Sequence, residues 1–189
     1  MKYPETRQDR RAGDTLHGTW VADPYRWLET DTSIETADWV ARQNAVTDAF
    51  LSQVPFRKDI AKRYEELYNF PKVGAPFKVG ELYFIEKNSG LQNQFVIYVR
   101  KGLSGEDKVF IDPNAVDPAG TTTFNLLGAS SDDRYMAVGV QRAGSDWQEI
   151  TVYDLTTMKQ TSELLKWAKF SGAAWYKNGF FYSRYPEPA

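Results

Sequence analysis

Cysteine is absent from the 189-residue sequence, and histidine occurs once, at His17. The absence of cysteine excludes disulfide bonds, thiolate nucleophiles and cysteine-based metal sites within this chain. A serine nucleophile is activated by a base, which is usually histidine. Because His17 stands beside Gly18 in a stretch without periodicity, we expect it to be a loop residue that makes a local hydrogen bond.

The sequence also lacks the short motifs that carry catalysis or cofactor binding. It has no Gly-x-Ser-x-Gly elbow, no phosphate-binding loop and no Gly-x-Gly-x-x-Gly fingerprint, and its Asp and Glu residues do not have the spacing of a calcium loop. Without cysteine, and with one histidine, a metal site would depend on carboxylates alone. We therefore predict no catalytic residue, no metal site and no cofactor in this chain.

Charge and hydropathy exclude two further kinds of partner. The formal net charge is −2 and no run of Lys or Arg forms a basic stripe, so nucleic acid is not an expected partner. The chain has no apolar run of roughly 18 residues and no apolar signal-peptide core at its N-terminus, so no membrane association is expected. The predicted compartment is the cytoplasm, with the periplasm as the alternative if a signal peptide has been removed.

Aromatic residues make up 15% of the chain and hydrophobic residues 42%, which favours a β-rich protein with a packed core. A glycine, a polar turn and an apolar strand recur about 50 residues apart, in 90–100 and 144–154. Further strands are expected around each copy, at 75–78, 82–85, 109–111, 124–129, 135–140 and 164–165, with a bend at 155–163. About four short strands per repeat is typical of a β-propeller blade.

A third repeat begins at 168–175 and continues at 180–183, where the sequence stops. An open propeller would expose unpaired strands and an apolar face, so we expect the chain to be a part of a larger protein. The Pro-rich end, 185–189, is predicted to be a surface loop at which a chain is nicked or cut, near Ala189.

Helices are predicted only in the first third of the chain. Residues 1–29 are expected to be irregular, Thr32 and Glu35 form a predicted capping box, and a helix follows to about Ser52. A second amphipathic helix is expected between Pro55 and Pro71. The predicted fold class is thus mixed: an N-terminal helical segment, 1–71, and an incomplete all-β propeller of about two and a half four-stranded blades, 72–189. The helical pair either packs on its own sheet or covers a domain outside this chain.

Three residues are candidates for contact with a ligand. Asp146 and Trp147 lie in a turn beside a strand, and Phe170 lies where the third repeat begins, so all three could face one rim or the central channel of the propeller. The alternative for Trp147 and Phe170 is packing between blades. The alternative for Asp146 is a turn cap that bonds the backbone two residues on.

Six segments, in order, resemble the prolyl oligopeptidase (prolyl endopeptidase) family. They are Lys2 to Arg7, Asp23 to Glu29, Gly90 to Gln94, Asp112 to Asn114, Gly144 to Trp147 and Lys169 to Gly172. The resemblance covers nearly the whole chain. Oligopeptidase B and the acylaminoacyl peptidases share the architecture but look less similar at Gly90 to Gln94 and at Gly144 to Trp147.

The resemblance implies a longer serine peptidase that cleaves short peptides after proline. In this family a seven-bladed propeller caps an α/β-hydrolase domain with a Ser-Asp-His triad, and the N-terminal helical segment belongs to that domain. The triad would lie beyond Ala189, in the remainder of the enzyme or in a second chain produced by a nick. The partners would then be an oligopeptide and that remainder. By the same resemblance, Phe170 helps to form the pocket for the substrate residue two positions before proline, and Asp146 and Trp147 face the hydrolase domain.

An alternative from another class is a propeller-derived binding module without catalysis. A downstream reading frame with an elbow serine would favour the peptidase, and a stop codon after position 189 of the native gene would favour the binding module.

Overall fold

The computed structural model describes residues 2–187, and the chain divides into two compact units between Glu66 and Leu67. Each unit is described by itself. The first holds a hairpin, a 3₁₀ turn and two helices: β1 (Gly13–Leu16), β2 (Thr19–Ala22), η1 (Arg26–Glu29), α1 (Ile34–Leu51) and α2 (Arg57–Tyr68), whose last turn contains the division.

The β1–β2 hairpin corrects the expectation that residues 1–29 are irregular. Its strands pair in register from Gly13 with Ala22 to Leu16 with Thr19. His17 and Gly18 form the turn, with φ of 51° and 82°. Two consecutive residues at positive φ match the twist of a two-residue hairpin, a conformation that glycine accepts readily. His17 is therefore an exposed turn residue.

Both predicted helices are present, but the cap of α1 differs from the prediction. Ser33, not Thr32, is the N-cap, and its Oγ accepts a hydrogen bond from the amide of Thr36 at 3.1 Å. Glu35 does not close a capping box, because both of its carboxylate oxygens accept hydrogen bonds from Arg7. The guanidinium of Arg7 lowers the pKa of Glu35. This contact thus weakens as the pH falls through that lowered pKa.

Two tryptophans hold the N-terminal stretch against η1 and α1. The indole of Trp27 donates to the carbonyl of Arg7 at 3.0 Å, and Arg7 lies 4.9 Å from the Trp27 ring. The indole of Trp39 donates to Thr6 Oγ1 at 2.9 Å. Cation–π contacts and indole hydrogen bonds of this kind give an extended segment a fixed path.

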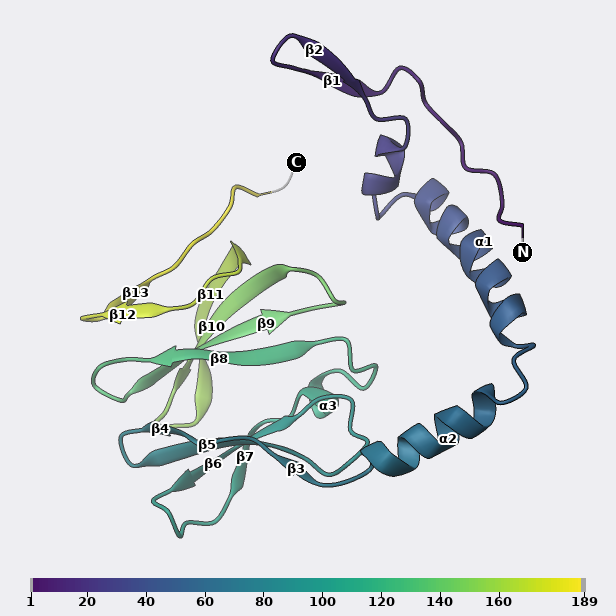
Figure 1. Cartoon of the computed structure of the whole chain (residues 1–189). Helices are drawn as coiled ribbons and strands as arrows, with labels where there is room; N and C mark the ends of the chain where they lie inside the picture. Colours follow the sequence, from purple (N-terminus) through teal and green to yellow (C-terminus); the bar gives the residue numbers. More distant parts are fainter. Residues whose placement is uncertain (1, 188–189) are drawn as a thin grey trace. The chain divides into compact units, whose positions relative to one another are not determined.

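The second unit consists of antiparallel sheets whose strands follow one another in the chain (Figure 1). The first sheet contains β3 (Lys72–Val73), β4 (Phe77–Val79), β5 (Leu82–Asn88), β6 (Val96–Lys101) and β7 (Lys108–Ile111). The short helix α3 (Pro113–Val116) leads to the second sheet of β8 (Thr123–Ala129), β9 (Tyr135–Gln141), β10 (Trp147–Asp154) and β11 (Lys159–Lys169). A hairpin of β12 (Ala174–Tyr176) and β13 (Gly179–Phe181) begins a third.

The predicted bend at 155–163 is too long, and this is the main correction in the second unit. Asp154 closes a tight turn by accepting hydrogen bonds from the amides of Thr156 and Thr157 at 2.8 and 3.1 Å. β11 therefore starts at Lys159 and runs for 11 residues. β11 is an edge strand, and its first part is polar because it is exposed to water. An apolar pattern in the sequence therefore does not reveal this part of the strand. Residues 168 and 169 end β11 and do not open the third repeat. β3 was also missed.

The second sheet buries both of its faces. On one face, Met136 and Val138 pack with residues of the first sheet, among them Phe84 and Ile97. On the other, Ala137 and Ile150 pack with residues of the β12–β13 hairpin, among them Trp175 and Phe180. The side chains of β9 alternate between the two faces, and five of its seven residues are buried. Burial on both faces explains why this strand is an uninterrupted apolar run in the sequence.

Candidate functional site

Four connections gather at one end of the second unit, which we call the loop end: 89–95, 112–122, 142–146 and 170–173. The first two are bonded to each other, since the side chain of Asn114 exchanges hydrogen bonds with the backbone of Gln94 at 2.9 and 3.0 Å. Thr123, which follows the second, pairs with Gln141, which precedes the third. Trp147, which follows the third, pairs with Lys169, which precedes the fourth. The opposite ends of the strands, at the turns 80–81, 102–107, 130–134, 155–158 and 177–178, form the turn end.

Phe170 projects from the loop end and is 79% exposed. Its backbone has φ of 51°, the left-handed region that costs a bulky residue energy. The next residue, Ser171, is buried and braced from two sides. Its carbonyl accepts from Gln148 Nε2 at 3.3 Å, and its Oγ accepts from the amide of Ser183 at 2.9 Å. A strained backbone, fixed through the hydrogen bonds of buried Ser171, thus holds the ring of Phe170 at the surface of the described residues.

Trp147 is half-buried at the start of β10 and contacts two other aromatic rings. Trp167 lies edge-on at 5.7 Å and Tyr185 edge-on at 6.0 Å between ring centroids. The amide of Tyr185 donates to the carbonyl of Trp167 at 2.8 Å, which ties the two ring-bearing segments together. Trp167 has φ of 63° in a bulge of β11. The ring contacts of Trp147 are made with β11 and with the segment after β13.

Asp146 forms an ion pair in place of the expected turn cap. Ser145 Oγ, not Asp146, accepts the amide of Trp147 at 3.1 Å. The carboxylate of Asp146 lies 3.6 Å from Lys169 Nζ. That ammonium also stands 5.2 Å from the Trp147 ring and 5.8 Å from the Phe170 ring. Lys169 therefore contacts all three residues that the sequence singled out.

We call this set the rim cluster: Asp146, Trp147, Trp167, Lys169, Phe170 and Tyr185. Trp167, Lys169 and Tyr185 were not among the candidates that the sequence pattern indicated. One signal for Lys169 was available, because it adjoins Phe170 in a segment that carries the family resemblance. Nothing local in the sequence points to Trp167 or Tyr185.

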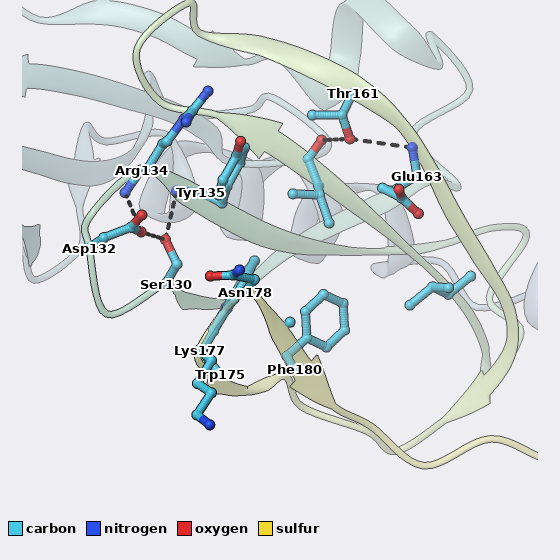
Figure 2. Close-up of a pocket in the computed structure, with 13 residues that line it drawn as sticks. Ser130, Asp132, Arg134, Tyr135, Thr161, Glu163, Trp175, Lys177, Asn178 and Phe180 are labelled. Atoms are coloured by element: carbon cyan, nitrogen blue, oxygen red, sulfur yellow. Dashed lines mark hydrogen bonds between the residues drawn. The ribbon is translucent and has the colours of Figure 1, made fainter.

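Shallow cavities flank the rim cluster, and a larger one lies elsewhere. A cavity of about 200 Å³ borders Trp147 and Trp167, and one of about 520 Å³ borders Phe170. A cavity of about 690 Å³ lies between the second sheet and the β12–β13 hairpin, mostly toward the turn end (Figure 2). Its polar side holds Ser130, whose Oγ donates to Asp132 at 2.6 Å and lowers the pKa of that carboxyl group.

The rim cluster holds aromatic and charged side chains and contains no histidine, serine or threonine. Its groups are three rings, a phenol and one ion pair, and His17 lies in the other unit. Among residues 2–187, no group of three His, Asp or Glu side chains is placed to hold a metal ion. No helix within this described range is long and apolar enough to cross a membrane.

Comparison with known protein families shows which family this chain belongs to. The family described as "Prolyl oligopeptidase, N-terminal beta-propeller domain" matches residues 4–189. The chain belongs to this family. The resemblance to prolyl oligopeptidase seen in the sequence is thereby confirmed, and so is the β-propeller fold of the strands that follow the helices.

Relatives of this prolyl oligopeptidase propeller match the whole chain. It is 41% identical over 189 residues to the prolyl endopeptidase of Elizabethkingia meningoseptica and 42% identical to that of Elizabethkingia miricola. A solved structure from work on two prolyl endopeptidases superposes with a TM-score of 0.83 at 30% identity, over 99% of this chain and 28% of that one. Prolyl oligopeptidase B from Galerina marginata, solved with a 35-residue hydrolysis and macrocyclization substrate, superposes with a TM-score of 0.76 at 29% identity, over 98% of this chain and 30% of that one.

The chain spans about a quarter of the two Elizabethkingia enzymes, 26% of each. These relatives are peptidases, which assigns the chain to a peptidase family.

Proposed function

We propose that this chain is the N-terminal part of a serine oligopeptidase that cleaves short peptides on the C-terminal side of proline. The catalytic triad belongs to the remainder of the protein, and the propeller controls access to it. The observation that carries the proposal is the exposed ring of Phe170, held at the loop end by a strained backbone with buried supports. A fixed exposed aromatic ring suits binding, and the chemistry then needs groups from outside the chain.

In this proposal the helical segment 1–71 packs on the peptidase domain. Its apolar side chains are exposed in the chain as described here, with Phe50 at 53%, Phe56 at 57% and Ile60 at 59%. Exposed apolar faces of this kind are typical of surfaces that another domain covers.

The third blade of a seven-bladed propeller would also be completed by residues from outside this chain. The cavity of about 690 Å³ is lined by Val152 and Leu165 of the second sheet and by Trp175 and Phe180 of the hairpin. A four-stranded third blade would place two more strands over this apolar floor. We propose that the remainder of the protein supplies them.

The rim cluster would contact the oligopeptide. Phe170 packs against the substrate residue two positions before proline, and Trp147 supports that pocket from β10. Asp146 faces the peptidase domain and pairs with a basic group across the cleft. Because Asp146 already lies 3.6 Å from Lys169, the basic group would share this carboxylate with Lys169.

Two further expectations accompany this proposal. If the remainder is a separate chain, the nick lies near Ala189, which is outside the described residues. The proposed compartment is the cytoplasm, with the periplasm as the alternative, and localisation of the tagged full-length protein would test it.

The peptidase proposal is tested by the full-length protein with a Gly-Pro chromogenic substrate and its Gly-Ala counterpart as the control. We expect cleavage of the proline substrate with at least about a hundredfold preference in kcat/KM, and no cleavage by the 189-residue chain alone. Equal cleavage of both substrates would point to another peptidase specificity. No cleavage, combined with peptide binding, would favour the alternative of a binding module.

A further inference from the structure

Lys169 contacts three other members of the rim cluster, Asp146, Trp147 and Phe170. Its side chain is 30% exposed, whereas that of Asp146 is 58% exposed. The ammonium is placed by backbone register, because Lys169 pairs directly with Trp147 across β10 and β11. The ammonium of Lys169 lies over the rings of Trp147 and Phe170. Cation–π contacts at a partly exposed site of this kind stabilise the ammonium there.

Four of the charged side chains in or beside the rim cluster form two opposite pairs. Arg142, in the connection before Asp146, lies 3.5 Å from Glu149 on β10. Asp146 pairs with Lys169 in the same way. Lys166, beside Trp167, is the further charged side chain on this part of β11. Within each pair the two charges offset each other near Phe170, while Lys166 adds a positive charge on β11.

We propose that the Lys169–Asp146 pair sets the charge selectivity of the rim, and that Lys169 is a specificity-determining residue. This inference rests on the proposed function, because it takes the rim to be the surface that meets the peptide. With the pair intact, the charges of Lys169 and Asp146 offset each other beside Phe170. Loss of one partner removes one charge of known sign, so the preference for acidic or basic peptides shifts in a direction set by that sign.

The size of the effect follows from Coulomb's law near a water-exposed surface. Two unit charges about 6 Å apart at a dielectric constant of 40 to 80 change affinity by roughly three- to tenfold. Exposed pairs lie at the lower end of this range, and the effect should shrink at about 1 M salt, where the Debye length is about 3 Å.

The test measures KM in the full-length protein for two peptides that differ only in the residue two positions before proline, Glu in one and Lys in the other. Lys169→Met should raise the KM ratio of the Glu peptide to the Lys peptide about ten- to hundredfold, because the two KM values shift in opposite directions by the factor given above. Asp146→Asn should lower the ratio by a similar factor. The double variant should return it close to the wild-type value. Lys169→Arg keeps the charge and should keep the ratio.

Lys101→Met is the matched control, because Lys101 pairs with Glu81 at 2.9 Å at the turn end. It should leave the ratio unchanged. A purely structural role for Lys169 would change KM or kcat for both peptides alike, and an unchanged ratio in Lys169→Met would overturn the inference.

Failure of the peptidase proposal can be distinguished from failure of the charge-selectivity inference. If the wild-type protein cleaves neither peptide, the proposed function is wrong. The dissociation constants, Kd, of the Glu and Lys peptides are then measured by tryptophan fluorescence, and their ratio replaces the KM ratio. A Kd ratio that shifts in Lys169→Met supports the charge selectivity. A ratio that stays constant, or the absence of binding, overturns it.

Discussion

Phe170→Ala in the full-length protein should raise KM about tenfold for peptides that extend two residues before proline, with kcat within about twofold. The exposed ring offers apolar surface that a bound peptide covers, and about 60 Å² covered at roughly 25 cal/mol per Å² is about 1.5 kcal/mol. Since this binding is the same in the ground state and the transition state, its loss appears in KM.

Substrate length provides the internal control for Phe170→Ala. A Gly-Pro substrate does not reach two residues before proline, so its KM should be unchanged. Leu103→Ala is the matched variant, because Leu103 is 75% exposed in a turn at the other end of the strands. A KM for the longer peptides that equals the wild-type value would remove Phe170 from the binding pocket.

Phe84→Ala should destabilise the second unit by about 3–5 kcal/mol, which is the usual cost of a phenylalanine-sized cavity in a core. Phe84 is 1% exposed and meets Phe110 edge-on at 5.1 Å. Phe110 in turn lies 5.1 Å from Tyr153 of the second sheet. The substitution thus removes a ring from the interface between the two sheets.

Hydrogen exchange measures the effect of Phe84→Ala within a large protein, because it reports local opening free energies. Amides of β5 and β6 should lose protection by the amount stated. Phe77→Ala is the matched control, since Phe77 pairs with Phe84 in the sheet but is 45% exposed. Equal losses in the two variants would contradict the assignment of Phe84 to the core.

The central strands could be predicted because their burial leaves a mark on the sequence. β9 is apolar from Tyr135 to Val140 because both of its faces are covered, and β5 and β6 begin with the apolar runs Leu82 to Ile85 and Val96 to Val99. The N-terminal hairpin and the start of β11 left no such mark. The residues of β1 and β2 are mostly exposed, and β11 begins with the polar residues Lys159 and Gln160. Exposed strands are specified by turns and register more than by hydropathy.

The candidate site divides along similar lines. Phe170, Trp147 and Asp146 could be proposed from the sequence because they stand beside a turn or at the expected start of a repeat, in segments that also resemble a family. Lys169 could not be joined to them, because its place opposite Trp147 depends on the register of β10 and β11. That register shifts between Gln148 and Ile150, where β11 contains a bulge. A bulge that depends on contacts from the rest of the sheet leaves little local signal.

The central claim is that the loop end meets the substrate, and photo-crosslinking tests it most directly. The probe is an uncleavable proline peptide with a benzoyl-phenylalanine two positions before proline, bound to the full-length protein and analysed by mass spectrometry after trypsin digestion. Our account predicts a label in the fragment 170–177, which trypsin releases between Lys169 and Lys177. Labels confined to turn-end fragments, such as the one containing Leu103, would contradict it.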